Sequence, residues 1–300
     1  MESLQYYAPA SLAEATQLLA EHKGSQVLAG GTDLLVQMRL GMKSPPALVD
    51  IKNISDIQQC GFTDSGELVI GAAVPCAQIT ESVAIAAKYP GLVEAAGLIG
   101  STQIQGRCSI GGNLCNASPA ADTVPALIAN HAVCEIQGVN GSRQVPVSEF
   151  NLAPGQNCLA EGEFLVALRI PALSGSDSAG RVVGCSDAYL RFIPRTEMDI
   201  AVVGAAVSLT VDLDGQCTQA CVAIGAVAPT ALIVPEASQA LVGTQLNESA
   251  LISAGQAATR ASKPINDKRG TAEYRKKVVA VLVRRAAVIA YQRALETFSD

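Results

Sequence analysis

Residues 26–34 read Gln-Val-Leu-Ala-Gly-Gly-Thr-Asp-Leu, so that a short apolar run enters a double glycine and a threonine-aspartate pair. Apolar residues then recur at helical spacing up to Leu40, and residues 47–51 form a second apolar run after a turn-forming Ser-Pro-Pro. This pattern predicts a strand, a glycine turn, a helix and a second strand, a βαβ unit whose strands lie parallel. A helix capped by Ser11 precedes it, so residues 1–55 are predicted to form a first lobe.

A second double glycine lies within Ser109-Ile110-Gly111-Gly112-Asn113. Consecutive glycines let several N–H groups point into one concavity, which suits the oxygens of a pyrophosphate. Neither motif has the spacing of a dinucleotide-binding G-x-G-x-x-G or of a P-loop. The two motifs therefore indicate either a phosphate site on another scaffold or two ordinary tight turns.

Asp122 follows the second motif and opens a helix predicted over residues 119–130. A carboxylate at the start of a helix caps and solvates it. An ionised carboxylate is also a pure acceptor, which suits the hydroxyl groups of a sugar or a ribityl chain. Both roles are open for Asp122.

The remaining periodicity predicts further strands and helices. Strands are expected over residues 68–72, 132–138 and 143–149, and helices over 76–88 and 91–99. The run of small polar residues over 172–184 suggests a domain boundary. Beyond it, apolar strands over 186–233, with a tight turn at Asp212–Gly215, and three helical patterns over 236–297 predict an α+β domain.

The last helical pattern begins after Thr271 and carries apolar residues at spacings of three, four and seven. It predicts an amphipathic helix packed on a sheet. The basic residues interleaved with that stripe are expected to be solvated: Arg275, Lys276, Lys277, Arg284 and Arg285.

Composition excludes several classes of protein. The 300 residues carry a net charge of -6 without a basic block, which argues against a nucleic-acid partner. The nine cysteines are dispersed and only two histidines occur, so neither a metal cluster nor a histidine-based triad is expected. The N-terminus has no signal pattern and no apolar run reaches the length of a membrane span, which predicts a cytoplasmic protein without membrane contact.

The two glycine motifs, together with Ala117-Ser-Pro-Ala-Ala-Asp122, resemble the paired FAD-binding motifs of molybdenum hydroxylase flavin subunits, the xanthine dehydrogenase and carbon monoxide dehydrogenase flavoprotein family. The resemblance continues in order through residues 48–51, 161–171, 194–201 and 267–275. It implies an α+β fold with a two-lobed, vanillyl-alcohol-oxidase-like (PCMH-type) FAD-binding domain and an α+β C-terminal domain of antiparallel sheet and helices. The implied bounds are 1–176, with lobes 1–55 and 56–176, and 177–300.

By this resemblance, residues 27–34 and 109–113 wrap the FAD pyrophosphate, Asp122 binds cofactor hydroxyls, and three further residues touch the flavin. A cation at Arg191, often lysine in the family, is expected to favour reduced, anionic flavin. The implied cofactor-binding residues are Val27, Leu28, Ala29, Gly30, Gly31, Thr32, Asp33, Leu34, Ile99, Ser109, Ile110, Gly111, Gly112, Asn113, Asp122, Leu165 and Arg191.

The resemblance also implies a division of labour between subunits. FAD would be held non-covalently here, because His22 and His131 lie outside the motifs and Cys108 and Cys115 are interpreted as packing residues. The molybdenum cofactor would lie on a large partner subunit and two 2Fe-2S clusters on a small one, in a heterotrimer that passes electrons to NAD or another acceptor. No catalytic acid, base or nucleophile is expected in this chain, since the flavin carries the chemistry.

Two other functions stay open. A self-contained FAD-dependent oxidoreductase on the same scaffold would need catalytic residues, and none is recognised in the sequence. A non-catalytic module would have lost flavin binding, yet both glycine pairs and Asp122 are intact. The iron-sulfur insertion of relatives that resemble 4-hydroxybenzoyl-CoA reductase is missing between Asn113 and Asp122, and the substrate of the complex is not encoded in this subunit.

Overall fold

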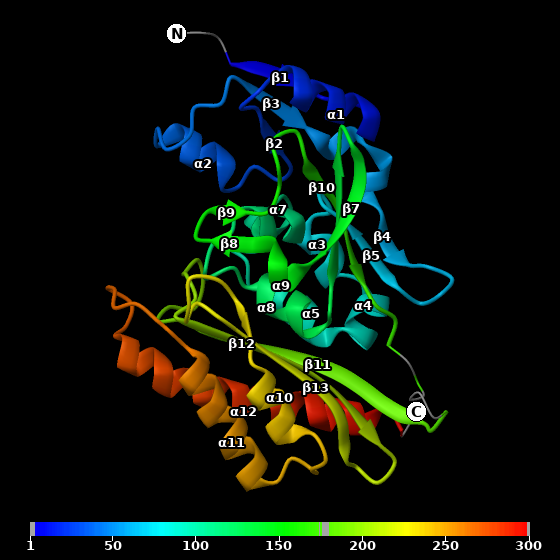
Figure 1. Cartoon of the computed structure of the whole chain (residues 1–300), viewed down its shortest axis with the longest axis vertical. Helices are drawn as coiled ribbons and strands as arrows, with labels where there is room; N and C mark the ends of the chain where they lie inside the picture. The colour runs from blue at the N-terminus through cyan, green and yellow to red at the C-terminus, as the bar shows by residue number, and fades with distance from the viewer. Residues whose placement is uncertain (1–3, 174, 176–179, 299–300) are drawn as a thin grey trace.

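The computed structural model describes residues 4–173, 175 and 180–298. Figure 1 shows three parts along the long axis: a small N-terminal lobe in blue, a second lobe in cyan and green, and a C-terminal sheet with its helices. Sheets and helices are combined in each part, which confirms the predicted α+β class. The predicted boundary at residues 176/177 falls on residues that lie outside the described ones.

The first lobe is a three-stranded parallel sheet in the order β1-β3-β2, with two helices. The predicted βαβ unit is confirmed, and a strand that the sequence did not indicate adds to its edge. A capping bond from the Glu14 N–H to Ser11 Oγ, at 3.2 Å, starts the first helix. The elements are β1 (Gln5–Tyr7), α1 (Leu12–Glu21), β2 (Gln26–Leu28), α2 (Leu34–Arg39) and β3 (Ala47–Asp50).

The second lobe is built on an antiparallel sheet in the order β4-β5-β10-β6-β7. Its strands are β4 (Cys60–Phe62), β5 (Leu68–Gly71), β6 (Val133–Gly138), β7 (Gly141–Pro146) and β10 (Phe164–Ile170). The short elements around it are η1 (Ile51–Asn53), η2 (Ser55–Gln58), α3 (Cys76–Thr80), α4 (Val83–Lys88), α5 (Pro90–Gly97), α6 (Thr102–Gln105), α7 (Ile110–Cys115), α8 (Thr123–Ala129), α9 (Val147–Phe150), β8 (Asn151–Ala153) and β9 (Gln156–Asn157).

Three sequence predictions in this lobe were wrong in their bounds. The helix expected over residues 76–88 is two helices, because Ser82 caps the second one through the Ile85 N–H. The helix expected from residue 119 begins only at Thr123, and the strand expected to reach residue 149 gives way to α9. Each error lies where a local cap or turn interrupts a continuous apolar pattern.

The C-terminal part is an antiparallel sheet in the order β11-β12-β13-β14, followed by three helices, as predicted. Gly215, at φ +75°, closes the predicted tight turn between β12 and β13. The elements are β11 (Val183–Phe192), β12 (Val203–Asp212), β13 (Cys217–Gly225), β14 (Leu232–Ile233), α10 (Pro235–Leu241), α11 (Glu248–Ala261) and α12 (Ala272–Glu296).

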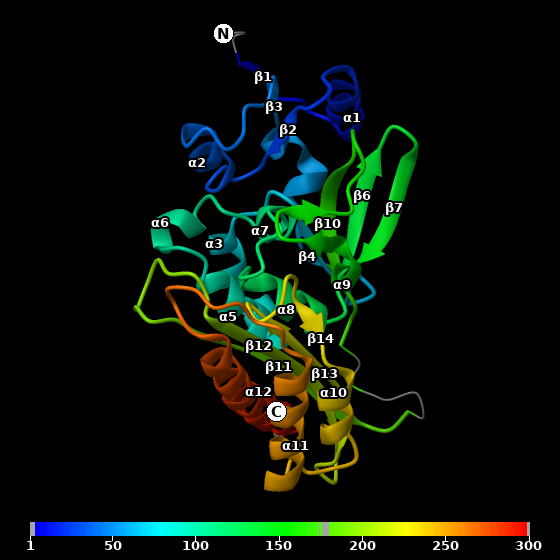
Figure 2. The ribbon, with the colours of Figure 1, turned by 60° about the vertical axis from the view of Figure 1, so that its left-hand side comes forward.

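Both faces of the C-terminal sheet are covered. Helix α12 packs on β11 and β12, while α5 and α8 of the second lobe pack on the same sheet from the other side, an arrangement visible in Figure 2. Because side chains alternate along a strand, Asp187, Tyr189 and Arg191 of β11 face the second lobe, whereas Ala188 joins the core formed with the C-terminal helices. Polar side chains of the C-terminal sheet are thereby buried against the second lobe.

Arg275 is not solvated, which corrects the interpretation of the last helix. Its side chain lies 4% exposed in α12. The guanidinium donates to the carbonyl oxygens of Val202 and Ala226, at 2.7 and 3.0 Å, and to Asp267 Oδ1 at 2.8 Å. Arg275 therefore joins the helix to three loops, those that contain Val202, Ala226 and Asp267.

Replacing Arg275 by alanine is expected to lower the free energy of unfolding by about 2–3 kcal/mol, because two buried carbonyl oxygens lose their donor. The neighbouring Lys276 is exposed, so Lys276→Ala is the matched control, with an expected change within about 0.5 kcal/mol. Urea unfolding of the two variants checks the prediction. Equal effects would contradict it.

Candidate functional site

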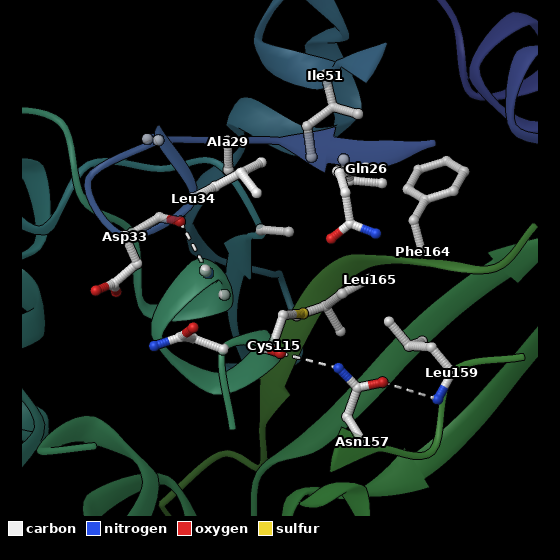
Figure 3. A pocket seen from close by; sticks show the side chains of 18 of the residues that line it. Gln26, Ala29, Asp33, Leu34, Ile51, Cys115, Asn157, Leu159, Phe164 and Leu165 are labelled. Carbon is white, nitrogen blue, oxygen red and sulfur yellow. Dashed lines mark hydrogen bonds between the residues drawn. The ribbon is translucent and has the colours of Figure 1, made fainter. Parts of the chain in front are cut away.

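A cavity of about 770 Å³ lies between the first and the second lobe. Pockets for cofactors and small ligands measure about 300–1,000 Å³, so a large cofactor fits. Figure 3 shows Gln26, Asp33 and Ile51 on one side of this space and Asn157 and Leu165 on the other. The lining contains these residues predicted from the sequence: Val27, Ala29, Gly30, Gly31, Thr32, Asp33, Leu34, Ile99, Ser109, Gly111, Gly112, Asn113 and Leu165.

The first glycine motif forms one wall where β2 turns into α2. Gly31 has φ +76°, a left-handed conformation that glycine adopts without strain. Among the described residues, the backbone N–H groups of 30–34 have no hydrogen-bond acceptor, whereas the Gly31 and Asp33 carbonyls accept from the next turn at 3.0 and 2.9 Å. Consecutive free donors at the start of a helix create a site for an anion.

Both glycine motifs pack backbone against backbone. A Cβ atom on Gly30 would overlap the carbonyl oxygen of Arg107 and lie 2.9 Å from Cα of Cys108. A Cβ atom on Gly111 would lie 2.5 Å from the carbonyl oxygen of Ala72. Only glycine permits these approaches, and the first of them brings the two motifs next to each other in space.

The second motif begins a helix, which corrects its interpretation as a turn. Ser109 is the N-cap of α7, and its Oγ accepts from the Gly112 N–H at 3.0 Å. Asn113 Oδ1 accepts from Thr123 Oγ1 at 2.7 Å, which ties α7 to the start of α8. Both glycines therefore lie in the first turn of α7, at the cavity wall.

Polar residues from distant segments complete the lining and were missed in the sequence. Gln37 Nε2 donates to Asn116 Oδ1 at 2.9 Å, so α2 and the end of α7 are bridged across the two lobes. Asn157 Nδ2 donates to the Cys115 carbonyl at 2.9 Å, and its Oδ1 accepts from the Leu159 N–H at 3.1 Å (Figure 3). No local pattern marks these residues, because only the tertiary fold brings them to the cavity.

Burial also changes the acidity of groups in this wall. It raises the pKa of Asp33, which lies beside the free N–H groups, and that of the Cys115 thiol to about 12. Cys108, like Cys115, belongs to the lining. The two cysteines that were interpreted as packing residues therefore lie in the wall of the cavity.

Four predicted residues lie outside the lining. Leu28 and Ile110 are buried behind the two motifs. Asp122 and Arg191 form an ion pair of 2.9 Å in which both side chains are at least nine-tenths buried. Neither side chain lines the cavity. Arg191 Nη1 also donates to the carbonyl oxygen of Leu98 at 2.9 Å, and the next residue, Ile99, does line it.

Asp122 is surrounded by donors in the seam between the second lobe and the C-terminal sheet. Tyr189 donates its hydroxyl to Asp122 Oδ1 at 2.9 Å, and Arg191 occupies Oδ2. Burial raises the pKa of Asp122 to about 6, although both neighbours lower it. The side chain does not cap α8, so the predicted helix-capping role is not seen.

The stability that Asp122 contributes is expected to fall as the pH rises from about 4 to about 6. Because the pKa is raised from 3.8 to about 6, the folded chain holds this proton more tightly than the unfolded chain, and losing it costs stability. In urea unfolding at stepped pH, the wild type should lose up to about 3 kcal/mol relative to Asp122→Asn over this range. A pH-independent difference would contradict the raised pKa.

The described residues contain neither a metal-binding cluster nor a helix that could span a membrane. All nine cysteines are free. No three side chains of His, Cys, Asp or Glu within residues 4–173, 175 and 180–298 are grouped to hold a metal ion. In that same part of the chain, no helix combines the length and the apolar character needed to cross a bilayer.

Two known protein families match successive parts of the chain. Residues 2–173 match the family described as the FAD binding domain in molybdopterin dehydrogenase. The chain belongs to the FAD-binding subunits of the molybdenum hydroxylases. Residues 188–290 match the CO dehydrogenase flavoprotein C-terminal domain, as expected for an oxidoreductase subunit of this family. The resemblance noted in the sequence is thus confirmed.

Relatives of this FAD-binding subunit match over nearly their whole length. The carbon monoxide dehydrogenase medium chain of Afipia carboxidovorans is 34% identical over 294 residues, which cover 97% of this chain and 98% of the relative. A putative xanthine dehydrogenase FAD-binding subunit of Escherichia coli is 29% identical over 280 residues, 93% of each chain. Neither comparison leaves a large segment of this subunit unmatched.

Solved structures agree with the fold. A chain of the cyanide-inactivated Cu,Mo-CO dehydrogenase has a TM-score of 0.90 at 33% identity, with 98% of this subunit and 100% of that chain covered. A chain of quinoline 2-oxidoreductase from Pseudomonas putida 86 has a TM-score of 0.87 at 27% identity, with 98% of each covered. Both glycine motifs of this subunit therefore lie within a fold that such enzymes share.

Proposed function

We propose that the cavity between the lobes holds FAD non-covalently, with its pyrophosphate at the free N–H groups of residues 30–34. That row of donors is the observation that carries the proposal. No side chain of the described residues accepts a hydrogen bond from these N–H groups. An anion with several oxygens can accept from several of them at once. Asp33 contributes the carboxylate of this motif, and the partial burial of that group raises its pKa.

The rest of the cavity suits the remainder of the cofactor. Ser109, Gly111, Gly112 and Asn113 border the pyrophosphate from the side of α7, while Ile99 and Leu165 offer apolar surface for the flavin rings. These residues bind and orient the cofactor and exclude water from it.

Asp122 and Arg191 act as supports behind this wall. Both oxygens of Asp122 are occupied, and the Arg191 guanidinium lies on the Leu98 carbonyl beside Ile99. We propose that the pair positions Ile99 and sets the charge behind the flavin. Arg191→Ala is therefore expected to change the flavin reduction potential, which a redox titration measures.

FAD, when bound, accepts and releases electrons one or two at a time. The titratable side chains of the lining are those of Asp33, Lys43, Cys108, Cys115, Glu161 and Glu163. We propose that none of them carries out the redox chemistry, so that the chain's own contribution is binding and orientation. We propose an electron-transfer role within a cytoplasmic heterotrimer, with a molybdenum-cofactor large subunit and a small subunit carrying two 2Fe-2S clusters. NAD or another acceptor would take the electrons.

The test is the visible absorption spectrum of the chain purified with its co-expressed neighbours, followed by acid treatment and metal analysis. Acid-released FAD together with molybdenum and iron supports the proposal. FAD without either metal favours a self-contained flavoenzyme. A colourless protein that takes up no added FAD contradicts both functions.

A further inference from the structure

Two cysteines face each other in the wall of the cavity. Pro75 and Ser109 form an isolated antiparallel bridge, which places their neighbours Cys76 and Cys108 directly opposite one another. The Cys76 N–H donates to the Cys108 carbonyl at 2.8 Å, so the two backbones are in direct contact.

The spacing of such a pair matches that of a disulfide. Directly opposed residues of antiparallel strands have Cα atoms about 4.5–5.5 Å apart, and disulfides join Cα atoms about 4.4–6.8 Å apart. Cys76 and Cys108 therefore need no large backbone movement to become linked. Both are free thiols in this structure.

The two thiols differ in access and in acidity. Cys108 lines the cavity and is 5% exposed, whereas Cys76 is fully buried. A hydrogen bond from the Cys76 thiol lowers the pKa of Cys108, while burial raises that of Cys115 and Cys217 to about 12 and that of Cys221 to about 11. Because Cys108 lines the cavity and Cys76 does not, Cys108 meets an oxidant first, and Cys76, directly opposite, is placed to resolve it.

We propose that Cys76 and Cys108 are a redox modification site, which hydrogen peroxide converts to an intramolecular disulfide. The Cys108 sulfur attacks peroxide, the O–O bond breaks, and a sulfenic acid and hydroxide form. The Cys76 sulfur then attacks the sulfenic sulfur, the S–O bond breaks and water leaves. In total, two thiols and one peroxide give one disulfide and two waters.

The link has a structural consequence for the cavity. Cys108 directly precedes Ser109, and its Cα lies against Gly30. A disulfide therefore fixes the junction of the two glycine motifs to the segment that carries Cys76. The modification acts on the wall of the site and not on a remote surface.

The test treats the full chain as purified with hydrogen peroxide, blocks remaining thiols with N-ethylmaleimide under denaturing conditions and maps the peptides by mass spectrometry. A Cys76–Cys108 link that dithiothreitol removes is expected. Cys76→Ala should abolish the link and leave Cys108 as a sulfenic acid that dimedone traps. Cys134→Ala is the matched control, because Cys134 is buried and free, and the link should form in it as in the wild type.

Met42 is the internal control for exposure to the oxidant. Its side chain is exposed to solvent, and peroxide converts such a thioether to a sulfoxide. If Met42 is oxidised while Cys76 and Cys108 both still react with N-ethylmaleimide, the proposal is overturned. A link from either residue to another cysteine overturns it as well. The visible spectrum of the same samples reports FAD separately, so failure of the thiol pair is distinguishable from failure of FAD binding.

Discussion

Gly30→Ala is expected to weaken FAD binding at least 100-fold, a loss of about 2.8 kcal/mol. The added Cβ would overlap the Arg107 carbonyl, so the turn must move away from the segment that leads into the second motif. That movement misplaces the row of N–H groups proposed to hold the pyrophosphate. Titration of the cofactor-free variant with FAD, followed by flavin fluorescence, measures the change.

Gly106→Ala is the matched control, one residue before Arg107. Its φ is -66°, and an added Cβ meets only the Gln103 carbonyl at an ordinary 3.7 Å. FAD affinity should stay within about twofold of the wild type, which corresponds to less than about 0.5 kcal/mol. Circular dichroism must show that both variants are folded. Unchanged FAD affinity in folded Gly30→Ala would contradict the assignment of the site.

Asp187→Ala is expected to lower the free energy of unfolding by about 3–5 kcal/mol. Asp187 lies fully buried in β11 and accepts from the N–H groups of Gly91 and Leu92, at 2.7 and 3.1 Å, and from Asn130 Nδ2 at 2.7 Å. Removing the carboxylate leaves three buried donors unsatisfied in the seam between α5, α8 and the C-terminal sheet. Urea unfolding at neutral pH measures the loss.

Asp64 offers the comparison for this variant, because it is an exposed aspartate in the turn between β4 and β5. Asp64→Ala should change the free energy of unfolding by less than about 0.5 kcal/mol. If Asp187→Ala behaves like Asp64→Ala, the seam does not depend on this carboxylate. The second lobe and the C-terminal sheet would then be held together by their other contacts, among them the Asp122–Arg191 ion pair.

Local patterns were sufficient to predict much of the fold. The βαβ unit around residues 26–51 was recognised because its strands are continuous apolar runs and its helix has a 3.6-residue period. The C-terminal strands and helices were recognised for the same reason. The central position of β10 between β5 and β6 was not predicted, because strand order depends on contacts between distant segments.

The site was predictable to the extent that it is local in sequence. Both glycine motifs line one cavity. They could be recognised in the sequence because the residue types themselves show what the backbone requires there. Asn157 and Gln37 carry no such mark. The pairing of Asp122 with Arg191, and the burial of Arg275, depend on which face of a strand or helix meets another element. A charged residue in an amphipathic pattern looks solvated until its partners are known.

The most direct test of the central claim is a calorimetric titration of the cofactor-free full chain with FAD and, separately, with riboflavin. If the N–H groups of residues 30–34 hold the pyrophosphate, FAD binds one to one and riboflavin, which has no phosphate, binds at least 100-fold more weakly, a gap of about 2.8 kcal/mol. Gly30→Ala should largely close that gap. Riboflavin binding as tight as that of FAD, or no binding of FAD, would contradict the account.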